Sequence, residues 1–416
     1  MKRAKWGCLS VVGLTALAVV ALLIWAYRPP RLEVPERQYP PNNAYEKLAA
    51  IAERLNEIER STPRLQMLSR RAHDTRAPAP MPAADHADYA RAVEPLLREY
   101  RRYLDAPSKV VMQYDPNNDP FFGIAPLLRN LARAENYFIR TAFARNRQEE
   151  VVERATALVK YSNQVSRDGA IISYLVGAAV RSIALDHVRK NIERLNNRAA
   201  LERLLRWAQE DERHRPAFVP ILETEHHYNR AMTMRMYRNP QPMDPASPQW
   251  WETMPLLPQI YIKTSIPEME WAWGQIKAYA AKPAWERKPG DFPRVRHPLN
   301  DALLPVFAQP INRRDADVAV ARLLGCVAAI RLHKQRTGRY PDSLEALNLG
   351  ELTIDPFTGK PFIYKVDPRK GVLIYSVGVN KRDDGGIVAE RDWYGEQGDL
   401  AIQPTGTKAQ TDLWLK

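Results

Sequence analysis

The chain has 416 residues and a formal net charge of +13 at pH 7. Its length allows roughly two or three domains with a sizeable core, and its 45% hydrophobic content excludes a wholly disordered protein. The positive charge is spread along the chain and is not gathered in one run, so nucleic-acid binding is not expected.

An apolar segment opens the chain and predicts a transmembrane anchor over residues 1–28. Its uncharged run at 6–27 would span about 33 Å as a helix, which is enough for the hydrocarbon core of a bilayer. Trp6, Trp25 and Tyr27 lie at the two ends of this run, where aromatic rings favour the membrane interface. We therefore expect a single-pass protein of the inner (cytoplasmic) membrane.

The charges that flank this segment predict its orientation. Lys2, Arg3 and Lys5 precede it and should stay in the cytoplasm, which places the bulk of the chain on the periplasmic or otherwise extracytoplasmic side. Arg28 and Arg31 on the far side reduce the asymmetry. A cleaved signal peptide is the alternative, but its apolar region would be unusually long and no clear Ala-X-Ala site precedes Arg28.

The two cysteines predict no staple for the fold. Cys8 lies at the start of the apolar segment and Cys326 in a late helix, so an anchor would keep them on or near opposite faces of the membrane. A disulfide needs two close Cα atoms, and this pair could not meet that condition. The sequence therefore indicates a fold that depends on its hydrophobic core, without a cysteine-based metal site.

A short proline-rich spacer at 29–43 precedes a helical domain at 44–234. Apolar residues recur with helical periodicity through most of this domain, and the connections between the periodic segments are short. Short connections favour antiparallel neighbours, so a bundle or a short solenoid is expected. The predicted helices are 44–58, 89–104, 124–144, 148–166, 169–196 and 199–212.

The composition changes at 235–314, where prolines are frequent and tryptophans gather. We expect irregular structure there, packed on the helical domain by aromatic side chains. One interpretation is an aromatic groove for a peptide or a glycan; the other is that tryptophans fill gaps between irregular segments. The five tryptophans of this region are Trp250, Trp251, Trp271, Trp273 and Trp285.

A polar cluster at the end of the helical domain is the first candidate for chemistry. It consists of Glu223, Glu225, His226 and His227. A zinc peptidase helix places its two histidines four residues apart, whereas adjacent histidines point about 100° apart on a helix. A solvated helix face is therefore expected, and an extracytoplasmic hydrolase with its site at 223–227 is the alternative.

Three alternating methionines follow, namely Met232, Met234 and Met236. Thioether sulfurs suit Cu(I), but a spacing of two residues distributes side chains over different faces of a helix. Core filling is the simpler interpretation, and copper handling is the alternative. Neither a phosphate-binding glycine loop nor a Gly-X-Ser-X-Gly motif occurs in the sequence, so we predict a protein that is not an enzyme.

The last domain, 315–405, has a different pattern. A long helix is expected from Asp315 to about residue 337, with Gly338 as its stop and Asp342 as the N-cap of a short second helix. Two alternating stretches at 362–366 and 372–377 predict an antiparallel hairpin, with 406–416 as a tail. The expected fold class is mainly α: a transmembrane helix, a helical bundle or short solenoid, and a small α+β domain.

Several motifs in this domain carry a family resemblance. After the long helix come Thr-Gly-Arg-Tyr-Pro-Asp at 337–342, Asp-Pro-Phe-Thr-Gly-Lys-Pro-Phe at 355–362, Tyr-Ser-Val-Gly at 375–378 and an acidic, glycine-rich loop. In order and spacing, this region resembles the soluble domain of the major pseudopilin of type II secretion systems. The resemblance implies a helix packed on a small antiparallel sheet, and a calcium ion in the loop.

The resemblance also implies calcium ligands. They would be Asn380, Asp383, Asp384 and Asp399, with backbone carbonyls near 376–377, and calcium prefers such oxygen donors. The family usually has aspartate where Asn380 stands. A pseudopilin also has a Gly-Phe-Thr-Leu-Ile-Glu cleavage motif at its apolar helix, whereas this chain has Trp-Gly-Cys-Leu at 6–9 and about 290 residues between the anchor and the matching domain.

These departures favour a tether for one molecule over a filament subunit. The whole pattern resembles large membrane-anchored envelope proteins of bacteria such as planctomycetes. We therefore expect a non-enzymatic structural or interaction role, with protein partners and a link to type II secretion or surface machinery. The hydrolase and copper alternatives stay open at this stage.

Overall fold

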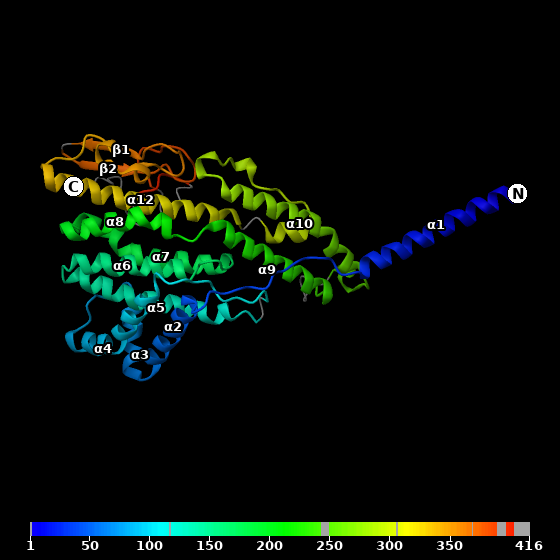
Figure 1. The fold of residues 1–416 in the computed structure, drawn as a ribbon, viewed down its shortest axis with the longest axis horizontal. Coiled ribbons are helices and arrows are strands. Elements are labelled where there is room, and N and C mark those ends of the chain that lie inside the picture. Colours follow the sequence, from blue (N-terminus) through cyan, green and yellow to red (C-terminus); the bar gives the residue numbers. More distant parts are fainter. Residues whose placement is uncertain are drawn as a thin grey trace.

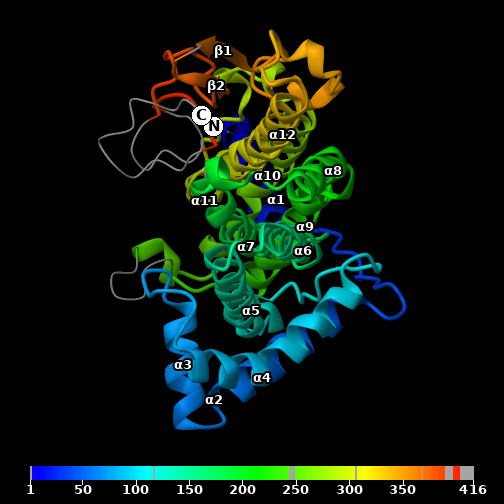
Figure 2. The ribbon, with the colours of Figure 1, turned by 90° about the vertical axis from the view of Figure 1, so that its left-hand side faces the viewer.

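The computed structural model describes residues 2–115, 118–242, 249–304, 307–367, 369–388 and 397–402, without the side chains of residues 2–13. Within these ranges the chain is mainly helical and carries one small antiparallel sheet, as predicted. The helices lie side by side in a stack, and the sheet covers the last long helix at one end of that stack (Figures 1 and 2).

Helix α1, Lys2–Tyr27, projects alone from this stack (Figure 1). From Leu14 onward its side chains are exposed, apart from Ala26 at its base. Among the described side chains, only helix α7, Ile171–Lys190, is long and apolar enough to cross a membrane, and 56% of its apolar window is buried inside the protein. The apolar part of α1 in the same set is the shorter stretch Leu14–Tyr27.

The segment 28–43 contains no helix and lies against the body instead of hanging free. Arg37 fastens it: the guanidinium donates to the carbonyls of Val110 at 3.0 Å and Asp168 at 2.7 Å, and to the Thr224 hydroxyl at 3.2 Å. The predicted spacer is therefore extended, but it is bound to three other parts of the chain.

The helices of the body agree with the predicted ones to within a few residues in most cases. Side chains of Asn43, Thr62, Asp119 and Asn197 accept backbone N–H bonds at four helix starts, which explains where those helices begin. Helix α3 was not predicted, and the predicted helix at 169–196 ends early and continues as a single 3₁₀ turn, Ile192–Arg194. The body consists of α2 Ala44–Arg60, α3 Pro63–His73, α4 Ala83–Tyr100, α5 Pro120–Ala144, α6 Gln148–Gln164, α7, and α8 Arg198–His214.

The prediction of irregular structure throughout 235–314 is wrong for residues 257–281. There the chain forms α10, Leu257–Ala281, which packs antiparallel on α9, Phe218–Arg238. Pro258 lies in the first turn, where a missing N–H costs nothing, and Pro267 is accommodated inside the helix. Trp273 is fully buried between the two helices, so one of the tryptophans is a core residue. A short helix, α11 Pro298–Leu303, follows.

Helix α12, Ala308–Thr337, begins earlier than predicted and joins the helical stack to the C-terminal sheet. Gly338, at φ +77°, ends it as expected, because glycine adopts this left-handed conformation without strain. The predicted hairpin is confirmed: β1 Ile363–Asp367 pairs antiparallel with β2 Gly371–Tyr375. The short second helix is only a 3₁₀ turn, Glu345–Leu347.

Candidate functional site

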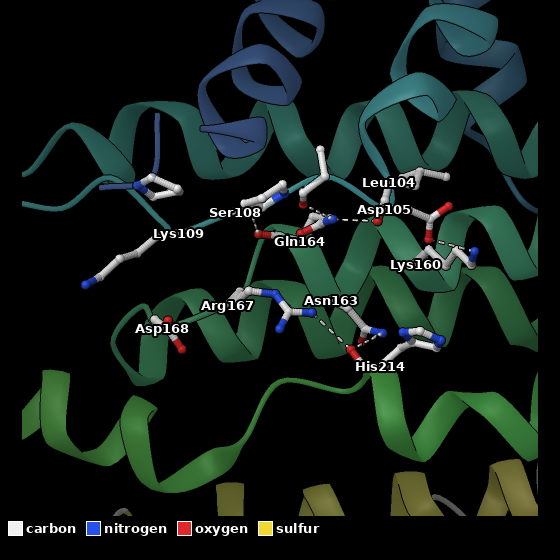
Figure 3. Close-up of a pocket in the computed structure, with 13 residues that line it drawn as sticks. Leu104, Asp105, Ser108, Lys109, Lys160, Asn163, Gln164, Arg167, Asp168 and His214 are labelled. Atoms are coloured by element: carbon white, nitrogen blue, oxygen red, sulfur yellow. Dashed lines mark hydrogen bonds and ion pairs between the residues drawn. The ribbon is translucent and has the colours of Figure 1, made fainter. Parts of the chain in front are cut away.

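A polar pocket of about 540 Å³ lies between the loop that follows α4 and the carboxyl ends of α6 and α8 (Figure 3). Lys109, Lys160, Arg167 and His214 line it together with Asp105. The Lys160 ammonium lies 2.8 Å from the Asp105 carboxylate, and Arg167 donates to the His214 carbonyl at 3.0 Å. No item of partner chemistry from the described residues meets the Lys109 ammonium, so the pocket has cationic character and suits an anionic group.

Two amide side chains hold the pocket in shape. Gln164 donates to the carbonyls of Leu104 at 2.5 Å and Ala106 at 3.0 Å, and Asn43 makes two bonds of 2.8 Å with the backbone of Lys109. Both amides are buried, so the loop at 104–109 is fixed at both ends. The sequence analysis did not single out Gln164 or Asn43, because their partners lie about sixty residues away.

The predicted cluster at 223–227 does not converge on one point. Glu223 is exposed, and Glu225 accepts from the backbone N–H of Ile171 at 2.8 Å, where it caps α7. Burial raises the pKa of Glu225. His226 is buried and points toward α10, with its Nε2 3.2 Å from Glu270. The expected solvated helix face is therefore correct only for Glu223.

His226 belongs to the core between α9 and α10. Its ring stacks on Trp273 with centroids 5.3 Å apart, and burial lowers the pKa of His226 to about 4. Arg230 makes a bidentate pair with the same Glu270, at 2.7 and 2.5 Å. The space between the two helices, where a catalytic cleft would have to open, is filled by apolar side chains around Trp273.

The three methionines do not share one face. Met232, Met234 and Met236 are all half-buried on α9, and Met236 packs on the small apolar cluster of Tyr237, Ile262 and Leu299. Within the described residues, no group of three or more His, Cys, Asp or Glu side chains is placed to hold a metal ion.

The predicted calcium residues lie in one loop, but backbone donors occupy most of their oxygens. Asp399 is fully buried and accepts from the N–H groups of Asp384 at 3.2 Å and Gly386 at 2.7 Å. Asp383 accepts from the Tyr375 hydroxyl at 2.8 Å, and the Asn380 amide donates to Asp384 at 3.0 Å. The described side chains therefore do not form a complete oxygen cage; residues 389–396 lie outside the described ranges.

A buried carboxylate explains one of the motifs shared with pseudopilins. Asp355 accepts from the N–H of Phe357 at 2.9 Å, from the Ser376 hydroxyl at 2.9 Å and from the N–H of Val377 at 3.0 Å. It thus ties the turn at 355–359 to the end of β2. This aspartate has a structural role in the part of the chain that carries the resemblance.

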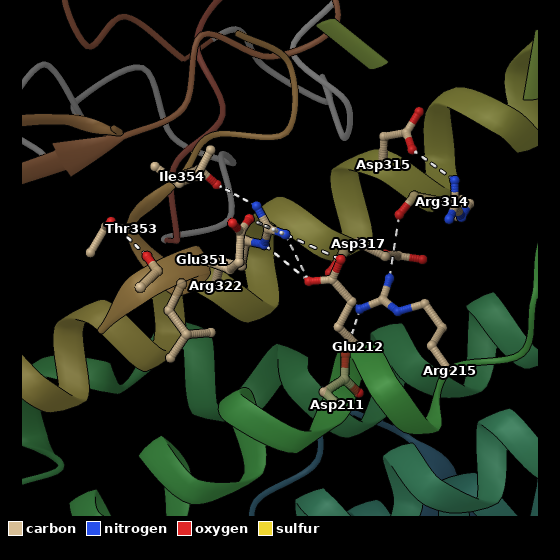
Figure 4. A network of polar contacts seen from close by, with 12 residues as sticks. Asp211, Glu212, Arg215, Arg314, Asp315, Asp317, Arg322, Glu351, Thr353 and Ile354 are labelled. Carbon is tan, nitrogen blue, oxygen red and sulfur yellow. Dashed lines mark hydrogen bonds and ion pairs between the residues drawn. The ribbon is translucent and has the colours of Figure 1, made fainter. Parts of the chain in front are cut away.

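A network of ion pairs joins α8 to α12 (Figure 4). Arg322 on α12 makes two bonds to Glu212 on α8, the shorter at 2.8 Å, and donates to the Ile354 carbonyl at 2.7 Å. Asp315 and Asp317 were expected at the start of a helix, but both lie inside α12 and are largely buried. They pair instead with Arg287 and Arg313, so that their charge is neutralised by side chains.

The base of α1 is the second place where distant elements converge. The Tyr237 hydroxyl at the end of α9 donates to the Ala26 carbonyl at 2.5 Å, and the Lys263 ammonium of α10 donates to the Trp25 carbonyl. The same ammonium lies 4.8 Å from the centre of the Trp25 ring. Both contacts saturate carbonyls in the last turn of the helix, which otherwise lack intrahelical partners.

Comparison of this chain with protein-family models, with curated proteins and with solved structures finds no match.

Proposed function

We propose that this chain is a single-pass, membrane-anchored protein with a non-enzymatic structural or interaction role on the extracytoplasmic side. The observation that carries the proposal is α1. It projects alone, its described apolar side chains face outward in all directions, and no other element covers them (Figure 1). Such a surface is costly in water and is suited to the hydrocarbon core of a bilayer.

The junction of α1 with the body supports a structural role. Tyr237 and Lys263 bind the last turn of α1 directly, so the anchor continues into the α9–α10 pair without a free linker. A body joined in this way is held close to the bilayer in a defined attitude. This geometry suits a protein that presents a surface to partners in the envelope.

The C-terminal part would supply such a surface. It has the order that the resemblance to pseudopilins implies, with a long helix followed by an antiparallel hairpin. Val366 and Ile387 are exposed apolar side chains on this part. We infer that it makes protein contacts with secretion or surface machinery, as one copy and not as a filament.

Membrane fractionation of the full-length chain tests the anchor. Wild-type protein should remain in the membrane pellet after alkaline carbonate extraction. Leu17→Arg combined with Val20→Arg should release it, because each arginine near a helix centre opposes insertion by roughly 3 kcal/mol. Met67→Arg, at an exposed apolar position of the body, is the matched control and should stay in the pellet.

A complete release of wild-type protein by carbonate would reject the anchor. The side of the membrane is tested separately with alkaline phosphatase fused to the C-terminus. Activity of the fusion in intact cells supports the extracytoplasmic orientation, and its absence together with full expression contradicts it.

Calcium is a separate part of the proposal and needs its own test. If calcium binds the loop at 380–399, adding it in large excess over its Kd should stabilise the full-length protein by about 3 kcal/mol. The Asp384→Asn variant should lose this gain, while Asp186→Asn on α7, an exposed control, should keep it. Equal melting temperatures in calcium and in EGTA would remove calcium from the proposal and leave the anchor untouched.

A further inference from the structure

The turn of the α9–α10 hairpin lies at the same end of the molecule as the anchor. Tyr237 closes α9 and Lys263 lies near the start of α10, and both bind carbonyls in the last turn of α1. Figure 1 shows this end of the hairpin beside the base of α1. Because residues 25–27 end the apolar run of the anchor, this hairpin end lies at the level where the hydrocarbon core of a bilayer would give way to headgroups.

The described part of this turn exposes large apolar side chains. Trp250 is 69% exposed, Met254 49% and Leu257 36%. They follow one another from a 3₁₀ helix, Trp250–Thr253, into the first residue of α10. A tryptophan beside aliphatic side chains is the composition that favours the interface of a bilayer.

Basic side chains surround the same end of the molecule. Arg28 and Arg31 follow the anchor directly, and Arg238 closes α9; all three are exposed. The Lys263 ammonium lies between the Trp25 and Tyr237 rings, 4.8 and 5.4 Å from their centres. Exposed cations next to exposed apolar groups complement the phosphate and acyl layers of an anionic lipid surface.

We propose that the hairpin turn, residues 250–257, enters the headgroup region of the same bilayer that α1 crosses. It forms a second membrane contact, which fixes the tilt of the body. This inference rests on the proposed anchor, and it names anionic lipid as the partner of the surface. Continuity with α1 favours lipid over a protein partner, because the bonds from Tyr237 and Lys263 leave the turn no distance from the bilayer.

A site-specific fluorophore tests the depth of the turn in the full-length chain. Met254→Cys, made in a Cys8→Ser background, is labelled with an environment-sensitive dye and reconstituted into phosphatidylglycerol–phosphatidylcholine vesicles. The remaining Cys326 is fully buried, and burial raises the pKa of its thiol to about 12, so it should not react. Met67→Cys on α3, another exposed methionine, is the matched control.

We expect the dye at position 254 to shift to shorter wavelength and to be quenched several-fold more by lipids brominated high on the acyl chain than the dye at position 67. Equal, weak quenching at both positions would overturn the inference. A wavelength shift at 254 without lipid quenching would also overturn it, because the turn would then be covered by protein, such as a second copy of the chain.

A third label separates this inference from the anchor itself. The dye at Leu17→Cys should be quenched by lipids brominated near the acyl-chain ends. Quenching at 17 without quenching at 254 rejects the second contact and keeps the anchor. Absence of quenching at 17 rejects the anchor, and the inference falls with it.

Discussion

Many arginines of this chain bond to groups inside the protein. Arg140, Arg154, Arg181, Arg287 and Arg322 are all buried. Arg140 donates to the Ala72 carbonyl at 2.8 Å and to the Ala77 carbonyl at 2.9 Å. Because a planar guanidinium offers five donors, it can connect elements that are far apart in the sequence. Part of the positive charge therefore has an internal, structural explanation.

Asp211 has the most completely paired carboxylate of this kind. Arg181 binds it through two bonds of 2.9 and 2.6 Å, and Arg215 adds a third of 2.5 Å. Burial alone would raise the pKa of Asp211, but the two arginines outweigh burial and lower the pKa to about 2. A lowered pKa means that the native state holds the ionised form more firmly than the unfolded chain does.

Replacing Asp211 should therefore destabilise the protein in a pH-dependent way. At neutral pH, Asp211→Asn should lower the free energy of unfolding by about 3 kcal/mol, because two buried arginines lose their partner. In wild type this contribution is complete above pH 4 and is lost as the pH falls through about 2, so the difference between the proteins should shrink in that window.

Urea unfolding of both proteins from pH 7 down to pH 2 measures this difference. Asp105→Asn is the control, because Asp105 is 73% exposed beside Lys160 and its pair should contribute less than about 1 kcal/mol. If the two variants lost the same stability at pH 7, the structural role of the buried pair would be refuted.

At the scale of elements, the contact of α8 with α12 depends on a small residue. Gly325 lies in the middle of α12, and a Cβ atom placed there would be 2.7 Å from the Cβ of Ala208 on α8. That distance is shorter than any relaxed contact, so the two helices pack with their backbones close together. Arg322 and Glu212 bond across the same contact, one turn away on α12.

A pair of identical substitutions tests this packing. Gly325→Ala should lower the stability by about 1–3 kcal/mol, because the helices must move apart. Gly274→Ala in α10 should raise it by about 0.5–1 kcal/mol, because Gly274 is exposed within a helix and nothing lies within 4 Å of its added methyl group. Chemical unfolding of both variants measures the two signs, and a stabilised Gly325→Ala protein would contradict the structure.

At the scale of the whole molecule, α12 belongs to both the helical stack and the C-terminal part. Every residue from 315 to 330 is buried, on the side of α8 and on the side of the sheet. Arg189 on α7 donates to the carbonyls of Ile402 at 2.6 Å and Ala401 at 3.2 Å. The sheet is therefore fastened to the stack through α7 as well as through α12.

We accordingly predict that the stack and the C-terminal part unfold together. In hydrogen exchange at rising urea, peptides from α8 and from β2 should lose protection at the same concentration, since one core runs through both. Arg189→Ala should shift both transitions equally. Loss of protection in β2 at clearly lower urea than in α8 would show instead that the C-terminal part is an independent domain.

Local signals predicted much of this fold. Helical periodicity and capping side chains located most helices, Gly338 marked the end of α12, and alternation located the hairpin. These features depend on residues a few positions apart, which a sequence displays directly. Helix α10 was missed because its prolines and tryptophans are typical of irregular structure, and only packing against α9 overrides that preference.

The candidate site could not be predicted in the same way. Glu225, His226 and the calcium-type aspartates form dense clusters in the sequence, yet Glu225 caps α7, His226 packs on Trp273 and Asp399 binds backbone N–H groups. Gln164, by contrast, stands in no motif and still shapes the pocket. A side chain's partner is set by distant chain segments, so a local cluster carries little information about it.

By itself, the sequence determined the uncharged run of α1, the helical character of the body and the hairpin, since each depends on composition and on the spacing of near neighbours. The tertiary structure decided which surfaces remain open. It buries α7 although that helix is apolar enough to cross a membrane, and it leaves α1 uncovered. It also brings Tyr237 and Lys263 to the last turn of α1, more than two hundred residues along the chain, because that contact depends on how α9 and α10 pack.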